Sequence, residues 1–556
     1  MHDKTSRKCH IIMREEYGWK LYKGSNIKIW FFGYQYNSNI EDLFSEASSI
    51  LCDHSVDKHS VLDWIKKISG HFSVVLETNK WVVAAVDKIC TNPIFFVEKE
   101  DGVFISNYAP ILKRECNLEV SDFNTSSGLE LSMSGHTIGK KTLYHSLNRL
   151  EGGECILYHQ GTIFKEFYYT YSPWKTKDRS KCKLKKEFTD ICINTLTDLK
   201  SSINGRQVVI PLSAGNDSRL IASGLKELGV KNIVCFSYGR KGNFETPISK
   251  AVAEKLGYQW LYLPTNLRDK HRFFKSDLYH KYVSDFESYG SIPNTQEIYE
   301  VSLLNKHPLI DSEAIIVNGN SGDFISGGHI SSISDLEYTM KSTSKSIWKF
   351  FLDKHYSLWG DLRTTANDDY IVSELEKILS LRITESVDVE KYHYAMMECI
   401  ECIGRQSRIV SNQQRTYEFF GYDWRLPLWS DDMLNFWESV PYEYKINQRL
   451  YIETLHENNW GDVWLDIKAN DKKINPYYLR WIRLLFKILF IPAGELKWHR
   501  FEKNFFEYFM HPSNALTVES YFKILFDRRE YRNANSWLSH KMIEDIRFNS
   551  DLQKEK

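Results

Sequence analysis

Residues 207–225 describe a strand that turns within a few residues into a helix. Gln207-Val208-Val209-Ile210 is apolar and β-branched, and helical periodicity begins after the short run Pro211-Leu212-Ser213-Ala214-Gly215-Asn216-Asp217-Ser218-Arg219. Such a turn aims backbone N–H groups and the positive end of a helix dipole at one point, which suits a phosphate. Ser213 and Ser218 add hydroxyl donors, and Asp217 can hold a metal ion that bridges phosphates.

The turn carries the string S-x-G-x-D-S and lacks the lysine that a Walker-type loop requires. It resembles the pyrophosphate-binding loop (PP-loop) of enzymes that split ATP between the α- and β-phosphates, whose usual form is S-G-G-x-D-S. Ala214 stands where that form has a glycine, so we expect a backbone without positive φ at this position. An ordinary strand-to-helix turn is the alternative that the string alone leaves open.

Strand and helix patterns alternate after this point of the chain. We expect strands at 207–212, 232–238 and 259–263 and helices at 218–228 and 247–256. This rhythm predicts a parallel sheet with helical crossovers, and from about residue 270 the pattern is mainly helical. Ligands of open parallel sheets bind at the carboxyl ends of the strands.

Two further segments are expected to reach that edge of the sheet. Cys235-Phe236-Ser237-Tyr238-Gly239 ends the second strand and can frame an adenine. Ile315-Ile316-Val317-Asn318-Gly319-Asn320-Ser321-Gly322-Asp323 is an apolar strand that enters a glycine-rich acidic turn. Asp323 would add a second carboxylate to a metal held by Asp217, and two carboxylates with phosphate oxygens make a suitable Mg²⁺ shell.

The first 170 residues follow a different pattern, with short apolar runs separated by turn residues. This pattern predicts an antiparallel, strand-rich domain, and the polar stretch Ser172–Lys186 is the candidate linker after it. The runs are Ile27–Phe32, Phe72–Leu76, Trp81–Val86, Ile94–Val97, Val103–Ser106 and Gly152–Tyr158.

Composition argues against several classes of partner. Lysine plus arginine equals aspartate plus glutamate at 72 each, so the chain offers no overall electrostatic case for nucleic acid. The ten cysteines are scattered, and only Cys399 and Cys402 have metal-like spacing, without a second pair to complete a zinc site. Scattered thiols, together with a polar stretch after Met1 in place of a secretory signal, lead us to expect a cytoplasmic protein.

The most apolar late segment is Trp481–Ile491. It is too short for a membrane span and carries two charges. We expect an amphipathic helix packed on its own domain, with a helix resting against a membrane face as the less favoured alternative.

The order of these motifs resembles the synthetase domain of the asparagine synthetase family. Asn318 to His329 aligns without a gap with that family's S-G-E-G-G-D-E-L-F-G-G-Y motif, and Asp423-Trp424-Arg425-Leu426-Pro427-Leu428 resembles its E-x-R-x-P-F segment. Gly70–Val75 and Asp87–Phe96 resemble its G-x-F-A-x-V and R-D-x-x-G-x-x-P-L-Y-Y motifs. No single motif is a perfect copy, but the resemblance extends to about residue 450.

The resemblance implies a mixed fold, with α/β and α+β parts. Residues 1–170 would be a glutaminase-like, Ntn-hydrolase-type antiparallel β sandwich, and 171–190 a linker. Residues 191–556 would be a PP-loop synthetase domain, of the adenine nucleotide alpha-hydrolase-like type, with a helical C-terminal part. Members of the family hydrolyse glutamine in the first domain, adenylate a carboxylate with ATP in the second, and let ammonia displace AMP.

The resemblance also implies which residues act. Asp217 and Asp323 would be catalytic and would hold Mg²⁺, and a lysine that steadies the phosphates falls among Lys468, Lys472 and Lys473. The residues expected to bind ATP are Leu212, Ser213, Ala214, Gly215, Asn216, Asp217, Ser218, Ser237, Gly239, Gly319 and Gly322.

Three positions depart from the family pattern. The family uses a cysteine directly after the initiator methionine, with its own freed amine as the base, and His2 stands there while Cys9 is internal. Asn320 replaces an acid thought to assist amide formation, and neutral asparagine cannot accept a proton. Phe324 replaces a glutamate. We therefore expect no glutamine hydrolysis by the family mechanism.

The sequence thus predicts an AMP- and pyrophosphate-forming carbon–nitrogen ligase that takes ATP, Mg²⁺, a small-molecule or peptide carboxylate, and ammonia or another amine. Aspartate is one such acid, and relatives with a silent first domain close β-lactam or lasso-peptide rings or amidate sugar acids. A decayed nucleotide-binding or regulatory scaffold is the main alternative, and a PP-loop enzyme that modifies tRNA is a weaker one. No nucleic acid and no transmembrane segment are expected, and a homodimer is compatible with the sequence.

Overall fold

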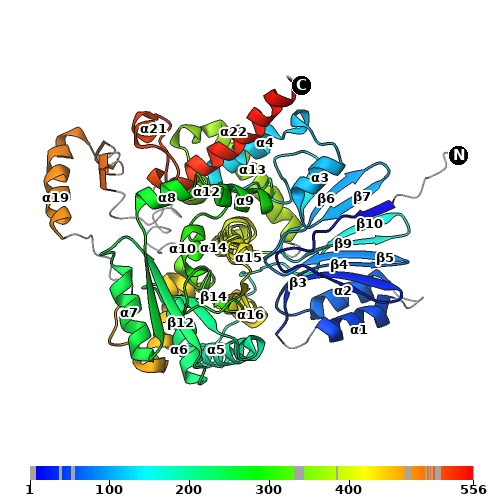
Figure 1. The fold of residues 1–556 in the computed structure, drawn as a ribbon, viewed down its shortest axis with the longest axis horizontal. Helices are drawn as coiled ribbons and strands as arrows, with labels where there is room; N and C mark the ends of the chain where they lie inside the picture. Colours follow the sequence, from blue (N-terminus) through cyan, green and yellow to red (C-terminus); the bar gives the residue numbers. More distant parts are fainter. Residues whose placement is uncertain are drawn as a thin grey trace.

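A computed structural model, drawn in Figure 1, gives the structure of the chain. It describes residues 8–36, 40–51, 57–330, 343–383, 386–469, 477–494, 497–499, 501–502, 505–506 and 515–554. None of the helices described there combines the length and the apolar character that crossing a membrane requires.

The N-terminal part contains two sheets that share one buried layer. A six-stranded antiparallel sheet has the order β10-β9-β5-β4-β3-β2, and a four-stranded sheet has the order β1-β7-β6-β8, in which β1 pairs parallel with β7. The strands are β1 (Lys8–Ile11), β2 (Lys20–Lys23), β3 (Ile27–Tyr34), β4 (His71–Thr78), β5 (Trp81–Val86), β6 (Phe95–Lys99), β7 (Gly102–Ser106), β8 (Leu147–Arg149), β9 (Glu154–His159) and β10 (Thr162–Phe167).

Successive side chains on these strands point to opposite faces of the sheets, so the two sheets pack against each other and helices cover their outer faces. The result is four layers. On β5, Val82 and Ala84 point into the core that also holds Val103 of β7, while Val83 packs with Trp64 of a covering helix. The helices α1 (Ile40–Leu51) and α2 (Lys58–Lys67) cover the outer face of the larger sheet, and α3 (Ala109–Glu115) and α4 (Thr125–Ser134) lie beyond the smaller one. The predicted strands are therefore confirmed, and β1, β2, β8 and β10 are additions.

The C-terminal part is built on a five-stranded parallel sheet of order β13-β12-β11-β14-β15. Its strands are β11 (Val208–Pro211), β12 (Ile233–Gly239), β13 (Gln259–Pro264), β14 (Ile315–Val317) and β15 (Asp423–Arg425), and the first crossover helices are α6 (Asp217–Glu227) and α7 (Glu245–Leu256). The predicted alternation is confirmed within two residues at each end. The chain is thus a mixed α/β structure with antiparallel sheets followed by a parallel one.

Helices make up most of the remaining chain, as predicted. They are α5 (Lys181–Ile203), α8 (Leu267–Phe273), α9 (Asp277–Asp285), α10 (Ile298–Leu304), α12 (Thr343–His355), α13 (Thr365–Arg382), α14 (Val389–Glu401), α15 (Gln413–Phe419), α16 (Asp431–Glu438), α17 (Tyr442–Lys445), α18 (Arg449–Asn458), α19 (Tyr478–Phe490), α21 (Tyr521–Phe526) and α22 (Ala534–Lys554). Two π-helical segments, Phe324–Gly328 and Cys402–Val410, interrupt the regular pattern.

The stretch expected as a linker is only partly extended. Residues 181–190 form the first turns of α5, whose N-cap Ser180 accepts a hydrogen bond from the Lys183 N–H. Tyr171 and Trp174 just before it are buried. The two parts are therefore closely packed at this junction, and the domain boundaries themselves stay a prediction.

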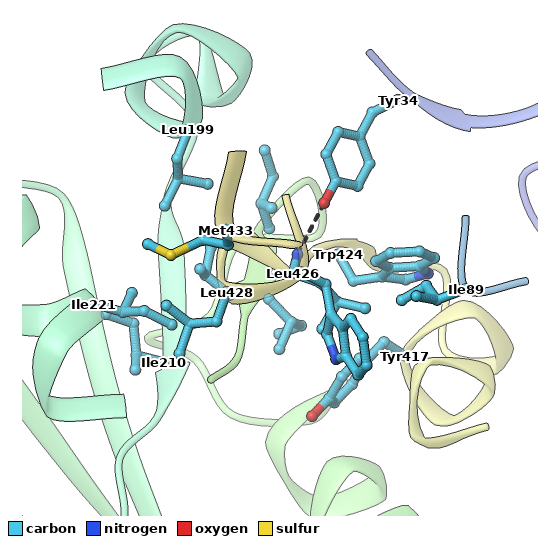
Figure 2. Packing of buried hydrophobic residues seen from close by; sticks show 14 of the residues in the cluster. Tyr34, Ile89, Leu199, Ile210, Ile221, Tyr417, Trp424, Leu426, Leu428 and Met433 are labelled. Carbon is cyan, nitrogen blue, oxygen red and sulfur yellow. Dashed lines mark hydrogen bonds between the residues drawn. The ribbon is translucent and has the colours of Figure 1, made fainter. Parts of the chain in front are cut away.

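One hydrophobic core runs through both parts. Tyr34, at the end of β3, reaches across so that its hydroxyl accepts a hydrogen bond of 2.8 Å from the Leu426 N–H (Figure 2). The Arg425 guanidinium lies 4.1 Å from the centre of the Tyr34 ring. Because Leu426 directly follows β15, the antiparallel sandwich is fastened to the edge strand of the parallel sheet.

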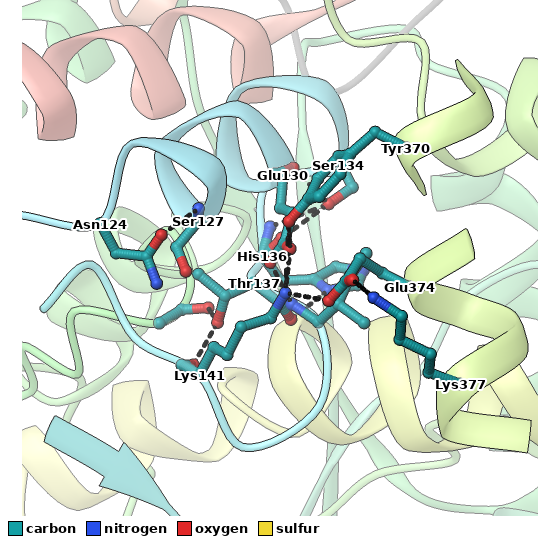
Figure 3. A network of polar contacts seen from close by, with 12 residues as sticks. Asn124, Ser127, Glu130, Ser134, His136, Thr137, Lys141, Tyr370, Glu374 and Lys377 are labelled. Carbon is teal, nitrogen blue, oxygen red and sulfur yellow. Dashed lines mark hydrogen bonds and ion pairs between the residues drawn. The ribbon is translucent and has the colours of Figure 1, made fainter. Parts of the chain in front are cut away.

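A buried carboxylate provides a second fastening (Figure 3). Glu130 on α4 is fully buried, and it accepts hydrogen bonds of 2.8 Å from the Ile138 N–H and from the Tyr370 hydroxyl of α13. It also forms an ion pair with Lys141, whose ammonium lies 2.8 Å from Glu374. Residues 240 positions apart in the chain are thereby joined through one carboxylate.

Glu130→Ala is expected to lower the free energy of unfolding by about 3 kcal/mol, because it removes the buried partner of a cation and of two further donors. The control is Glu376→Ala, an exposed glutamate on α13. Chemical denaturation of both variants tests this, and equal midpoints for the two would contradict it.

Candidate functional site

The order of strands in the parallel sheet defines where a ligand can enter. From β11 the chain moves outward to β12 and β13 and then returns to the other side of β11 as β14. Val208 and Val209 pair with Ile315 and Ile316, so the loops that follow β11 and β14 leave the sheet side by side. This reversal of direction opens a crevice at the carboxyl ends of the two strands.

The loop at residues 212–216 is braced by its own hydroxyl groups. The Ser213 N–H donates to Ser218 Oγ and the Gly215 N–H donates to Ser213 Oγ, each over 3.1 Å. None of residues 212–218, all of which are described, has a positive φ. Ala214 therefore has no positive φ, as predicted from the sequence, and the residue is buried.

Glycines allow the loop after β14 to lie directly against the start of α6. A Cβ atom at Gly319 would stand 2.7 Å from the Asp217 carbonyl carbon, and one at Gly322 would stand 2.7 Å from Asp217 Cγ. With that space open, the Asp323 N–H donates to Asp217 Oδ2 over 2.8 Å. The two predicted acidic residues are thus brought together, 106 positions apart in the chain.

The two carboxyl groups have opposite electrostatic environments. Burial and the charge of Asp323 raise the pKa of Asp217, although its Oδ1 accepts a hydrogen bond of 2.9 Å from the Tyr451 hydroxyl. Desolvation also opposes ionisation of Asp323, but hydrogen bonding to His329 and the charge of that imidazole outweigh it and lower the pKa of Asp323. Asp323 is therefore the ionised member of the pair.

His329 connects this pair to a buried glutamate. Its Nε2 lies 3.3 Å from Asp323 Oδ2 and its Nδ1 lies 2.5 Å from Glu401 Oε1. Burial lowers the pKa of His329, but the two carboxylates outweigh that effect and raise it to about 9. The imidazole is therefore cationic at neutral pH and cannot act as a general base there.

Asp217, Asp323 and His329 line a cleft of about 410 Å³. Of the residues predicted to act there, the cleft is lined by Leu212, Ser213, Asp217, Ser218, Ser237, Gly319 and Asp323. The residues predicted to bind ATP that do not line it are Ala214, Gly215, Asn216, Gly239 and Gly322. Gly322 instead provides the close contact with Asp217, and Gly239 adopts a φ of 122° at the end of β12.

Of the predicted lysines, the structure describes only Lys468. Lys468 is exposed and does not line the cleft, while Lys472 and Lys473 lie outside the described residues. The segment before Lys468 is tied to α6 by Arg219, which donates to the carbonyl oxygens of Val463 and Ile467 over 3.0 and 2.5 Å. The positive side chains that do line the cleft are Arg405 and His329.

Sequence reasoning missed Arg405 because it lies in an unremarkable helical stretch. The π-helical segment Cys402–Val410 directs Arg405 and Gln406 toward the cleft, and Gln406 binds both Ser321 and Glu401. π-helical insertions occur frequently at functional sites, but no residue pattern in the chain marks this one.

The two departures from the family motif have different environments. Asn320 lines the cleft and its amide donates to Gln413 over 2.8 Å. Phe324 is fully buried, and its ring lies 5.9 Å from that of Trp429 and 5.7 Å from that of His329. Asn320 therefore retains access to a ligand, whereas Phe324 serves the core.

Cys9 is not arranged as a terminal nucleophile. It lies within β1 opposite Val103, and the preceding Lys8 N–H donates to the Asp101 carbonyl over 2.9 Å. Burial, with a smaller effect of Glu77, raises the pKa of the Cys9 thiol to about 12. His2 lies outside the described residues.

The donor set at the cleft fits a hard divalent cation bound together with phosphates. Mg²⁺ in such sites is held by a few carboxylates together with phosphate oxygens, and a cation would offset both the burial and the charge of Asp323 that raise the pKa of Asp217. Within the described part of the chain, no group of three or more His, Cys, Asp or Glu side chains could hold a metal ion, so protein ligands here would be limited to the two carboxylates.

No protein-family model matches the chain, and no curated protein matches it. Several solved structures are distantly similar, two enzymes among them. One is described as the allosteric regulatory enzyme of purine biosynthesis (10% identity over 44% of this chain and 62% of that one, TM-score 0.18). The other is glutamine phosphoribosylpyrophosphate amidotransferase from B. subtilis complexed with ADP and GMP (10% identity, 55% of this chain and 64% of that one, TM-score 0.18). The chain spans somewhat less than two thirds of either structure, and similarity at this level establishes neither a shared fold nor a shared function.

Gly319→Ala is expected to destabilise the protein by about 1–3 kcal/mol, because the new methyl group would overlap the Asp217 backbone. Gly205→Asn is the control, since a Cβ there meets nothing within 4 Å and asparagine tolerates its φ of 76°. Denaturation midpoints decide the matter, and a Gly319→Ala variant as stable as the control would show that the two loops are not tightly packed.

Proposed function

We propose that the chain is an ATP-dependent ligase that adenylates a carboxylate, releases pyrophosphate and transfers ammonia or another amine to the acyl group. The observation that carries the proposal is the hydrogen bond that joins Asp323 to Asp217 at the point where the strand order of the parallel sheet reverses. It brings the serine-rich loop after β11 and the acidic loop after β14 to one cleft. In this proposal residues 1–170 are the Ntn-type domain and residues 191–556 the PP-loop synthetase domain.

The cleft offers partners for each part of ATP. The hydroxyl groups of Ser213 and Ser218 and the nearby start of α6 face the position proposed for the phosphates. Ser237 and Tyr238, at the end of β12, line the wall proposed for the adenine. The Tyr238 ring is held by a hydrogen bond of 2.9 Å from its hydroxyl to Glu297.

The first chemical step forms a bond between a substrate carboxylate oxygen and the α-phosphorus of ATP and breaks the bond from that phosphorus to pyrophosphate. Negative charge accumulates on the leaving pyrophosphate, so positive groups already in place lower the barrier. Arg405 and cationic His329 are the side chains that we propose for this role, in place of Lys468. Asp217 and Asp323 would hold Mg²⁺, which would neutralise charge on the phosphates.

In the second step the amine nitrogen bonds to the acyl carbon, the bond from that carbon to the AMP oxygen breaks, and the proton that the nitrogen loses passes to the departing AMP phosphate or to water. Asn320 can donate a hydrogen bond to a ligand at the cleft but cannot accept a proton from the amine. An amine that reaches the cleft already neutral is therefore the most suitable nucleophile. We include ammonia in solution among the donors for this reason, and the geometry of Cys9 gives no support to glutamine hydrolysis by a terminal cysteine.

Purified protein is expected to catalyse ATP–pyrophosphate exchange when its carboxylate is present, and Asp217→Ala is expected to reduce the rate by at least 100-fold. A panel of aspartate, uronic acids and short peptides would identify the acid. Glu254→Gln, an exposed change on α7, serves as the control. Exchange at the wild-type rate in Asp217→Ala would overturn the role given to that residue.

A binding or regulatory protein on a former synthetase scaffold is the second candidate. It is favoured by Phe324, because a buried aromatic ring occupies the position at which the family has an acid. Calorimetric titration with ATP and the exchange assay together separate the two. Both candidates bind ATP, but the scaffold gives no exchange on any acid of the panel.

With the acid identified, ammonium is expected to support amide formation and glutamine is not. The reason is that the described N-terminal part contains no cysteine with a free α-amine beside its thiol. Release of glutamate from glutamine, followed by amino-acid analysis, would contradict this expectation.

A further inference from the structure

The helix α19 has an apolar face that the rest of the described chain leaves uncovered. Figure 1 shows it at the edge of the molecule, apart from the three sheets. Trp481, Leu485 and Leu489 are 58%, 63% and 69% exposed. The sequence led us to expect this helix to pack on its domain, and that expectation is wrong for this face.

Another side of α19 is covered by side chains that follow it in the chain, so the helix has packing partners of its own. Leu479 is buried against Trp498 and Phe506, and Phe490 packs on the same small cluster. The Phe490 and Phe501 rings stack with their centres 4.7 Å apart. The helix therefore has an inner apolar stripe with partners within its own hairpin and an outer apolar face without them.

The outer face follows a regular helical spacing. Its members recur three or four positions apart, so they lie on one side of the helix. They are Tyr478, Trp481, Ile482, Leu485, Ile488 and Leu489, all more than one third exposed. A contiguous apolar surface of this kind is uncommon on a protein that meets only water, and it indicates a docking surface.

Charge distinguishes among the surfaces that could cover this face. Residues 477–494 contain Arg480, Arg483 and Lys487 and no acidic residue, although the whole chain has a formal net charge of zero. The three cations are spaced three and four positions apart and, at about 100° per residue, lie on the polar side of the helix, away from the outer apolar face. Arg483 forms an ion pair with Glu502, whereas Lys487 is exposed. A helix with an exposed apolar face, a cationic polar side, and Tyr477, Tyr478 and Trp481 at one end matches an anionic bilayer surface.

A second copy of the chain fits this face less well. A 13-residue helix is roughly 20 Å long, so one face covers a few hundred Å², below the roughly 800 Å² per partner of a stable interface. The same length is too short to cross a hydrocarbon core of about 30 Å.

We infer that α19 is an interfacial membrane anchor, which lies in the plane of an anionic lipid surface with Trp481, Leu485 and Leu489 inserted among the acyl chains. Arg480 and Lys487, on the polar side of the helix, would face the headgroups and the adjacent water and add electrostatic attraction to the anionic surface. This inference is independent of the ligase proposal, because none of the residues of α19 lines the cleft.

The test is flotation of the full chain with vesicles of phosphatidylcholine alone or with one third phosphatidylserine. We expect binding to the anionic vesicles that weakens with added salt, at least a tenfold loss of binding in Leu485→Glu/Leu489→Glu, and about a fivefold loss in Lys487→Glu. Leu381→Glu is the matched control, because Leu381 is a leucine of α13 that is 66% exposed. The control is expected to bind like the wild type.

All these substitutions are at exposed positions, and thermal unfolding followed by circular dichroism verifies that each variant is folded. The inference is overturned if the wild type binds neither kind of vesicle, or if the double glutamate variant binds as well as the wild type. It is also overturned if the wild type is a dimer by light scattering that the double variant converts to a monomer without any effect of vesicles, because a second copy would then be the occupant.

Discussion

The hydrogen bond from the Asp323 N–H to the Asp217 carboxylate is the contact on which the cleft depends. It can form only because Gly319 and Gly322 present no side chain to the first residue of α6. Two further side chains contact the same carboxyl groups: the Tyr451 hydroxyl, from α18, donates to Asp217, and His329, six residues after Asp323, contacts Asp323. The hydrogen bond between the two aspartates thereby holds the loop after β14 against the start of α6, at one edge of the parallel sheet.

One hydrogen bond is also important where the two parts of the chain meet. A single tyrosine hydroxyl from β3 accepts the Leu426 N–H just after the edge strand β15. That N–H would otherwise be a buried donor without a partner, which is costly. Tyr34 thus supports the strand whose neighbour, β14, leads into the acidic loop. The arrangement lets a strand-rich domain contribute to the geometry of a cleft to which it supplies no lining residue.

The parallel sheet was predictable from local sequence because the apolar runs before Pro211 and Gly239 and the helical runs between them have distinct periods. The meeting of Asp217 with Asp323 was predictable as well, since both follow strands of one sheet and the carboxyl ends of those strands share an edge. Arg405 and His329 were not, because their place depends on a π-helical segment and on Gly327, whose φ of 97° turns the chain back. The exposure of α19 was also beyond the sequence, because an amphipathic pattern indicates that one face needs a partner and not which partner it has.

Phe324 also limits which substitutions its position tolerates. The ring is enclosed by aromatic neighbours, among them Trp429 and Tyr171, with no water-facing surface. An acid introduced there by one substitution would leave both a cavity and a desolvated charge, each a penalty of several kcal/mol. The aromatic shell therefore keeps this position apolar for as long as its neighbours are unchanged.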